Sequence, residues 1–237
     1  MTDRDDGSGV DSSRALETLE TLEALEDEVA TMKQVVREGD DPHRTRFEAV
    51  ANRLQEVLAE TNGGHGTIDT RSGERITPLD PDPKRIALTD VAHALSNLSR
   101  FTGQGKEFYS VARHAVHVSR EVEARGGTRE AQRWGLLHDA SEAYFSDVPA
   151  PVKQSLPGYT RAEKRFQAAV REAFDLELTV EDERLVDAVD GDIARYELSI
   201  HFPANHESPG LECEHDDLES GGDEGLYLRR ASELALR

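Results

Sequence analysis

Apolar residues recur at helical spacing in most segments of this 237-residue chain, and glycine, proline or Asp-rich breaks separate one segment from the next. A helix buries one apolar stripe and must pack it against other elements, so the repeated pattern favours a bundle. Only residues 67–79, around Gly73, alternate weakly as a short hairpin does. The sequence therefore predicts an all-α fold with at most a minor β-hairpin. We expect helices over residues 90–100, 109–124, 128–138, 161–174 and 179–196, and an irregular connection over the proline-rich residues 149–158.

Threonines mark the expected starts of three of these helices. Thr89, Thr128 and Thr179 each precede a segment of helical periodicity, and a threonine hydroxyl there can accept from an unpaired amide of the first turn. Asp182 follows Thr179 by three residues, the spacing of a capping box. These residues predict capped N-termini.

The chain divides into three parts by composition. Residues 1–64 are interpreted as a helical N-terminal extension, residues 65–202 as the main domain, and residues 203–237 as an acidic tail that closes with one more helix. The first helix of the extension carries a heptad-like seam of only about two heptads, too short for a coiled-coil prediction. Its residues are Leu22, Leu25, Val29, Met32 and Val36. The extension packs either on its own domain or on a second copy, and we expect a homodimer.

One stretch of the main domain concentrates chemically useful side chains. His138, Asp139, Glu142, Asp147 and Lys153 place an imidazole, three carboxylates and an ammonium within sixteen residues, directly after an apolar helical run. Histidine and aspartate are both metal ligands, and on a helix Glu142 could share a face with the pair. A carboxylate beside a metal that is not needed as a ligand is suited to moving protons.

Further ligands are needed to complete a site, and two lie in amphipathic segments. His114 is 24 residues before His138, and Asp190 is 51 residues after Asp139. Three helices could bring two nitrogens and two oxygens to one divalent cation. A second pair, His215-Asp216, follows no apolar helix and is interpreted as solvated tail. Spacing alone leaves His117, Asp187 and Asp192 as competitors.

With these residues in view, the chain resembles the HD-domain metal-dependent phosphohydrolases, and among them the 5′-deoxynucleotidases and their phage-encoded relatives. The resemblance covers roughly residues 68–200. Its most specific part runs from His138 to Tyr144 and continues through Asp147, Pro149, Pro151 and Lys153. It implies an HD-domain helical bundle.

The resemblance also implies roles. It makes His114, His138, Asp139 and Asp190 the ligands of one divalent metal ion, which could be Mn, Co, Fe, Ni, Zn or Mg. Glu142 and Asp147 would handle the attacking water and its protons. Arg100 and Lys153 would face the substrate phosphate. One departure stands beside the first ligand: the family usually has an acidic or amide residue before it and serine after it, where this chain has Arg113 and Ala115.

The net charge of the chain limits the kinds of partner that it can bind. The net charge is −20, from 28 basic and 48 acidic residues, and such a field repels nucleic-acid phosphates. We therefore expect no duplex nucleic acid as partner. The basic residues are mostly arginine, and an acidic, lysine-poor composition is typical of a salt-rich cytoplasm. The first ten residues are polar and charged, and no apolar run reaches membrane-spanning length, so we expect a cytoplasmic protein without a membrane partner.

The expected reaction is metal-dependent hydrolysis of a phosphate monoester, with a nucleoside 5′-monophosphate as the leading small-molecule substrate. Another nucleotide, such as an alarmone, a cyclic dinucleotide or a triphosphate, would use the same ligands. A non-catalytic nucleotide-binding regulator is the alternative from another class, although it would have no need of Glu142 and Asp147.

Overall fold

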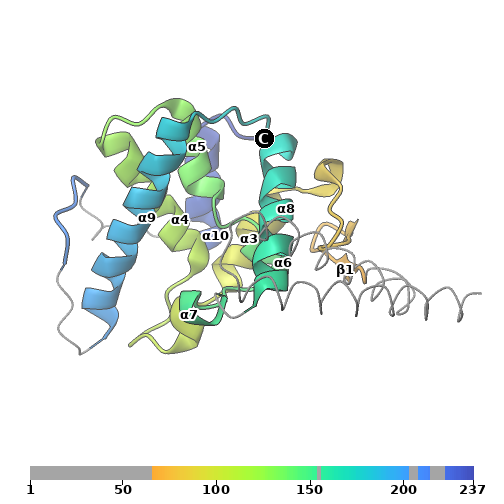
Figure 1. Cartoon of the computed structure of the whole chain (residues 1–237), viewed down its shortest axis with the longest axis horizontal. Coiled ribbons are helices and arrows are strands. Elements are labelled where there is room, and N and C mark those ends of the chain that lie inside the picture. Colours follow the sequence, from red (N-terminus) through yellow and green to blue (C-terminus); the bar gives the residue numbers. More distant parts are fainter. Residues whose placement is uncertain (1–65, 154–155, 203–207, 214–221) are drawn as a thin grey trace, which may run out of the picture. The chain divides into compact units, whose positions relative to one another are not determined.

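The computed structural model describes residues 66–153, 156–202, 208–213 and 222–237, all within one compact unit, Gly66–Arg237 (Figure 1). The N-terminal extension, its apolar seam and the homodimer expected from it lie outside the described residues. His215-Asp216 lies outside them as well.

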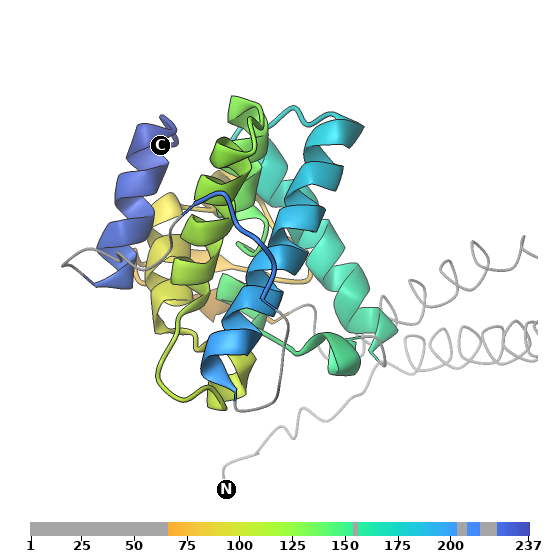
Figure 2. The same ribbon diagram turned by 90° about the vertical axis from the view of Figure 1, so that its left-hand side faces the viewer.

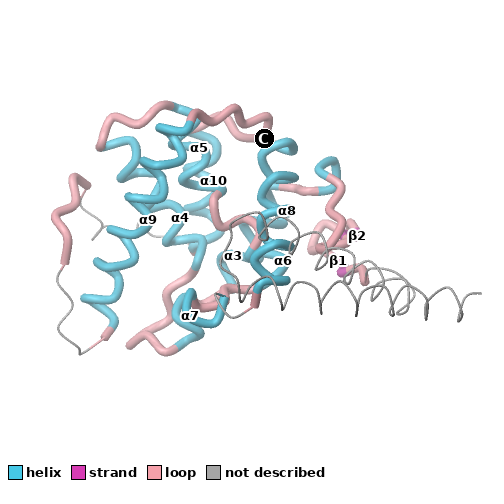
Figure 3. The backbone as a smooth tube through the Cα atoms, in the orientation of Figure 1, coloured by secondary structure: helices cyan, strands magenta, loops and turns pink. Residues whose placement is uncertain are grey.

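The regular secondary structure of the described residues is helical apart from a two-stranded hairpin and one isolated β-bridge, as Figure 3 shows, so the all-α prediction is confirmed. The hairpin pairs β1 (Ile68–Asp69) with β2 (Arg75–Ile76) in antiparallel register. Two 3₁₀ turns are η1 (Pro83–Arg85) and η2 (Arg100–Gly103). The α-helices are α3 (Leu88–Asn97), α4 (Val111–Ala124), α5 (Arg129–Leu137), α6 (Glu142–Phe145), α7 (Ala150–Lys153), α8 (Pro157–Ala173), α9 (Val180–His201) and α10 (Asp223–Glu233).

Helix α4 is the centre of the bundle. It packs against α3, α5, α9 and α10, and Figure 2 shows α9 and α10 on opposite sides of it. Most of its residues are buried, including His114, His117 and Glu121. Buried polar groups must find partners inside the protein, so the polar residues of α4 are the ones that organise the interior.

The threonine caps are confirmed at two of three positions. The Thr128 hydroxyl accepts from an amide in the first turn of α5, and Thr179 forms the capping box with Asp182 at the start of α9. Asp182 also accepts from the Thr128 hydroxyl at 2.6 Å, which ties the two N-termini together. The prediction for Thr89 was wrong, because α3 begins at Leu88 and no side chain caps it.

Two segments differ from their sequence interpretation. Part of the connection expected to be irregular is helical, since α7 lies within it and α8 begins at Pro157. A proline lacks the amide that a first turn leaves unpaired, so it suits this position. The terminal helix, which the sequence interpretation assigned to the tail, packs as α10 into the core through Leu226, Tyr227 and Ala231.

Arg113, which departs from the resembled pattern, connects α4 to α10. Its guanidinium Nη2 lies 2.8 Å from Asp223 Oδ1, and the Ser110 hydroxyl donates to the other oxygen of Asp223 at 2.6 Å. Ala115 is buried in the core. None of the described helices has both the length and the apolar composition that crossing a bilayer requires.

Candidate metal centre

The His138-Asp139 pair lies at a break between two helices. Helix α5 ends at Leu137, His138 is its C-cap residue, and α6 begins at Glu142. The Glu142 amide donates to the Asp139 carbonyl at 2.9 Å, a bond that spans three residues and closes a tight turn. The helical face that the sequence suggested for these three residues is therefore interrupted, and the turn sets the direction of each side chain.

Both histidines present the same ring nitrogen to the centre. His138 Nδ1 lies 2.9 Å from the Gly135 carbonyl, which can only accept, so Nδ1 carries the proton. His114 Nδ1 lies 2.8 Å from Glu197 Oε1, and donates to that carboxylate in the same way. When the imidazole is neutral, this arrangement leaves the lone pair on its Nε2, and it is the outer-sphere pattern of metal-binding histidines.

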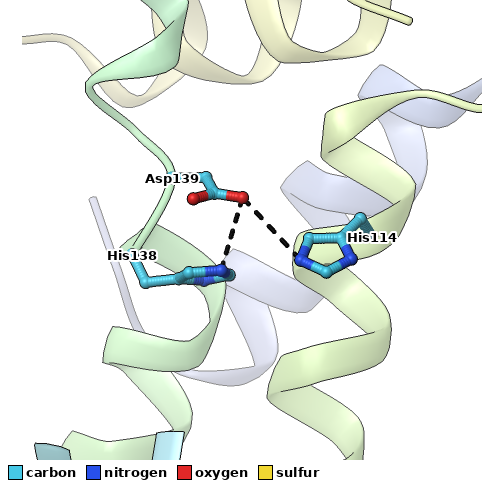
Figure 4. Close-up of side chains that lie close together, drawn as sticks. All are labelled: His114, His138 and Asp139. Carbon is cyan, nitrogen blue, oxygen red and sulfur yellow. Dashed lines mark ion pairs between the residues drawn. The ribbon is translucent and has the colours of Figure 1, made fainter. Parts of the chain in front are cut away.

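The two Nε2 atoms converge on Asp139, as Figure 4 shows. Asp139 Oδ2 lies 3.3 Å from His138 Nε2 and 3.7 Å from His114 Nε2. Atoms that bind one ion at ordinary N/O ligand distances lie about 3.0–3.6 Å from one another, so the distance to His138 matches this spacing and the distance to His114 is slightly longer. His138 Nε2 is buried and makes no hydrogen bond to any described residue. The three side chains therefore form a group that could hold a metal ion.

Asp190, from α9, approaches the same point. Its Oδ1 lies 2.9 Å from His114 Nε2 and 3.7 Å from His138 Nε2. The competitors left open by spacing lie elsewhere: Asp192 pairs with Arg125 at 2.7 Å, and His117 Nδ1 hydrogen-bonds the Tyr109 hydroxyl at 2.7 Å. Asp187 lines the neighbouring cavity without belonging to the group of three. The four residues proposed as ligands thus come together.

Arg100 reaches the centre from η2. Its Nη1 lies 3.9 Å from Asp139 Oδ2, and its Nη2 donates to Glu197 Oε2 at 3.0 Å. Burial by itself lowers the pKa of this guanidinium, but the carboxylates of Glu197 and Asp139 raise it above its usual value. A fixed positive charge therefore stands beside the candidate ligands.

Neighbouring charges also control the charge of His114. Burial and Arg100 lower its pKa, while Glu197 and Asp190 raise it, with a net value of about 9. A histidine binds a metal ion in its neutral form, so loading this centre would displace a proton.

Glu142 and Lys153 contact each other. Glu142 Oε1 accepts from Lys153 Nζ at 3.0 Å, and the same ammonium lies 2.6 Å from Glu163 Oε1. Glu142 Oε2 is buried and has no hydrogen-bond partner among the described residues. Burial, with Asp139 and Asp147, raises the pKa of Glu142 well above its usual range. Lys153, predicted to face substrate phosphate, is thus placed between two carboxylates.

Asp147 follows a turn of unusual backbone geometry. Ser146 has φ 70°, and Phe101 and Thr102, which follow Arg100, have φ 58° and 52°. Such conformations are costly for residues other than glycine and persist where the surroundings hold them, commonly at functional sites. Burial raises the pKa of Asp147, and the nearby charge of Arg100 opposes the rise. Arg100 and Asp147 are therefore each adjacent to a backbone turn with positive φ, which the surrounding structure must stabilise.

A cavity of about 650 Å³ opens beside the centre, between α5, α8 and α9. His138, Asp139 and Asp190 form one side, and Lys164, Arg171, Glu183 and Asp187 supply the other charges. The Arg171 guanidinium lies over the Trp134 ring, 4.3 Å from its centroid. The volume falls in the range of small-molecule sites.

Two curated proteins resemble this chain, and no protein-family model matches it. The uncharacterized protein YfdR of Escherichia coli is 45% identical over 109 residues, which are 46% of this chain and 58% of YfdR. An uncharacterized protein of Rhodobacter capsulatus is 39% identical over an alignment of 134 residues, and the alignment covers 53% of this chain and 68% of that protein. The chain belongs to the family of the Rhodobacter protein. Neither relative's name states an activity, and this chain spans little more than half the length of YfdR.

Within this family member, Glu197 is the residue whose importance the sequence understated. It is fully buried, and its carboxylate accepts from both His114 and Arg100. Burial opposes its charge, but His114 and Arg100 hold its pKa at about 2. Its position seven residues after Asp190, two turns along α9 and on the same face, was the available signal.

Proposed function

We propose that this chain is an HD-domain metal-dependent phosphohydrolase that cleaves a phosphate monoester, with a nucleoside 5′-monophosphate as its leading substrate. The observation that carries the proposal is the convergence of His114 Nε2 and His138 Nε2 on carboxylates, with Nδ1 of each ring engaged by an acceptor. The run from His138 to Tyr144 with Asp147 supports the same family independently of this geometry.

His114, His138, Asp139 and Asp190 would hold the ion, since two neutral imidazoles and two carboxylates balance a divalent charge. The donor set fits such an ion because His138 Nε2 is otherwise a buried polar atom without a partner among the described residues. When bound, the ion would acidify water and polarise a phosphoryl oxygen.

The other residues have roles set by charge and position. Arg100 Nη1 faces Asp139 and can donate to a phosphate oxygen in the centre, while its Nη2 and Nε stay on Glu197. Glu142 Oε2 is the buried acceptor available to orient a water and take its proton. Asp147 is placed near Arg100 and Asp139 for the same task.

The charges of the cavity favour one phosphate over three. Lys164 and Arg171 are matched there by Glu183 and Asp187, and Arg171 pairs directly with Glu183. Among the described residues that line this cavity, no cationic surplus remains to neutralise a polyphosphate, whereas a neutral nucleoside body fits a polar lining with Trp134 beside it. This balance supports a monophosphate substrate.

The test is a hydrolysis panel with metal-stripped protein. Nucleoside 5′-monophosphates, 3′-monophosphates, triphosphates, an alarmone and a cyclic dinucleotide are each incubated with Mn²⁺, Co²⁺, Mg²⁺ or Zn²⁺, and phosphate release is measured. We expect metal-dependent release from 5′-monophosphates. Turnover of another nucleotide alone would reassign the substrate, and nucleotide binding without any turnover would identify a regulator.

Asp139→Ala is the matched loss-of-metal variant. We expect the fold to survive and both metal content and turnover to be lost, while Asp80→Ala, at an exposed aspartate after β2, retains both. Full metal occupancy in Asp139→Ala, measured by elemental analysis, would remove Asp139 from the ligand set.

A further inference from the structure

Helix α8 sends two side chains toward the candidate catalytic carboxylates. Glu163 Oε1 lies 2.6 Å from Lys153 Nζ, whose other carboxylate contact is Glu142 Oε1 at 3.0 Å. The Tyr159 hydroxyl donates to the Ser146 carbonyl at 2.8 Å, one residue before Asp147. We propose that Lys153, Glu163 and Tyr159 are positioning residues that fix Glu142 and Asp147, and that Lys153 does not bind substrate. This inference rests on the proposed function.

The surroundings of Lys153 explain why it is not a phosphate ligand. The exposed fractions of the side chains are 23% for Lys153, 3% for Glu142 and 11% for Glu163, so the three groups are largely shielded from water. Two carboxylates within hydrogen-bond distance cancel the field that the ammonium would present to a phosphate. At low dielectric, such contacts are strong and hold their partners in one geometry.

As a consequence, the two carboxylate oxygens of Glu142 have different surroundings. Lys153 occupies Oε1, while Oε2 is buried and lacks a partner in the described part of the chain. A carboxylate anchored through one oxygen cannot turn freely, so the other oxygen keeps a fixed direction. The pair therefore prepares a single acceptor for a water molecule before substrate arrives.

Tyr159 acts on the neighbouring turn. Ser146 has φ 70° and ψ 159°, a backbone conformation that residues other than glycine rarely adopt. The Ser146 amide donates to the Glu142 carbonyl at 2.8 Å. The Tyr159 hydroxyl donates a hydrogen bond to the Ser146 carbonyl. The Tyr159 ring packs edge to face against the ring of Phe145, with the centroids 5.9 Å apart. These contacts hold the backbone that leads directly into Asp147.

The experiment compares kcat, KM and metal content on the monoester that the wild type hydrolyses. We expect Lys153→Met to lower kcat by ~10–100-fold, with KM and metal content unchanged and with partial rescue in Lys153→Arg. Glu163→Gln and Tyr159→Phe, which preserve shape, lower kcat in the same way. Glu172→Gln, at an exposed glutamate of the same helix, is the control and leaves kcat unchanged.

A double variant tests whether Lys153 acts through Glu142. In a Glu142→Gln background, adding Lys153→Met costs no further activity, because the group it positions is already gone. An independent loss there overturns the inference, as does a rise in KM at constant kcat, which would mean that Lys153 touches substrate.

Amide hydrogen exchange separates this inference from the proposed function. Exchange at residues 142–149 is faster in Lys153→Met and Tyr159→Phe than in the wild type, and unchanged in Glu172→Gln. If the wild type hydrolyses no phosphomonoester, the proposed function fails. If exchange in both variants equals that of the Glu172→Gln control, the positioning contacts fail, whatever the activity.

Discussion

Glu197→Gln tests the arrangement around the centre most directly. Glu197 accepts from His114 Nδ1 at 2.8 Å and from Arg100 Nη2 and Nε at 3.0 and 3.3 Å, and it is fully buried. Glutamine has nearly the same shape but offers one acceptor oxygen, and its amide group turns a donor toward the remaining donors.

The magnitude follows from burial. Removing one partner from a buried ion pair costs ~3–5 kcal/mol, and we expect about 3 kcal/mol because glutamine keeps one acceptor. For a domain of this size that loss corresponds to a fall in Tm of about 6–12 °C. His114 would also lose the acceptor that fixes its tautomer, so metal affinity should fall ~10–100-fold.

The assay pairs thermal unfolding of metal-free protein with a metal titration. Glu121→Gln is the control, since Glu121 is fully buried on α4 and accepts from Arg125 and from the amides of Glu212 and Cys213. It should lose stability but bind metal normally. Wild-type metal affinity in Glu197→Gln would refute the role assigned to Glu197.

Three other predictions address catalysis, assembly and pH. Glu142→Ala should keep the metal and lose ~10²–10⁴ in turnover, since Glu142 is proposed as a general acid–base group and not as a ligand; loss of the metal itself would make Glu142 a ligand. Deleting residues 1–64 should reduce the mass seen in sedimentation from dimer to monomer, and an unchanged distribution would place the apolar seam within one chain. The hydrogen bond from Thr128 lowers the pKa of Asp182, against burial and with help from Thr179. A lowered pKa means that Asp182 stabilises the fold above its unfolded pKa of about 3.9 and loses that effect as the pH falls through its folded value. The stability gap between wild type and Asp182→Asn in urea unfolding should therefore be wide at pH 7 and narrow in acid; a constant gap would contradict the sign.

The features that could be predicted from the sequence are those that depend on residues close together in the chain. Thr128 and Thr179 cap helices because their hydroxyls meet amides three residues on, and helical periodicity marked the segments that became α4, α5 and α9. Thr89 failed because a capping residue is recognised only relative to the helix start, which lay two residues earlier than expected.

The residues of the candidate site could be predicted as a set of possible ligand types, whereas most of their contacts could not. His114, Asp139 and Asp190 come together from segments far apart in the chain, and only the resemblance selected Asp190 over its acidic neighbours. The roles of Glu197 and Lys153 depend on what α4, α6 and α8 bring to them, which no local pattern encodes. The sequence alone does not distinguish a lysine that pairs with two carboxylates from a lysine that is free to bind phosphate.

The packing of α10 sets a lower limit on the length of a fragment that can fold by itself. The Tyr227 hydroxyl donates to the Leu136 carbonyl at 2.8 Å, two residues before His138, and the Arg230 guanidinium donates to the Ser119 hydroxyl of α4 at 2.9 Å. A fragment ending at residue 202 would contain every candidate ligand yet leave that carbonyl and the apolar side of α4 uncovered. Shortening the protein to the segment that carries its motifs would therefore give an unstable product. Any fragment that ends at residue 202 would fail in an activity assay because it does not fold, whatever the state of its candidate ligands.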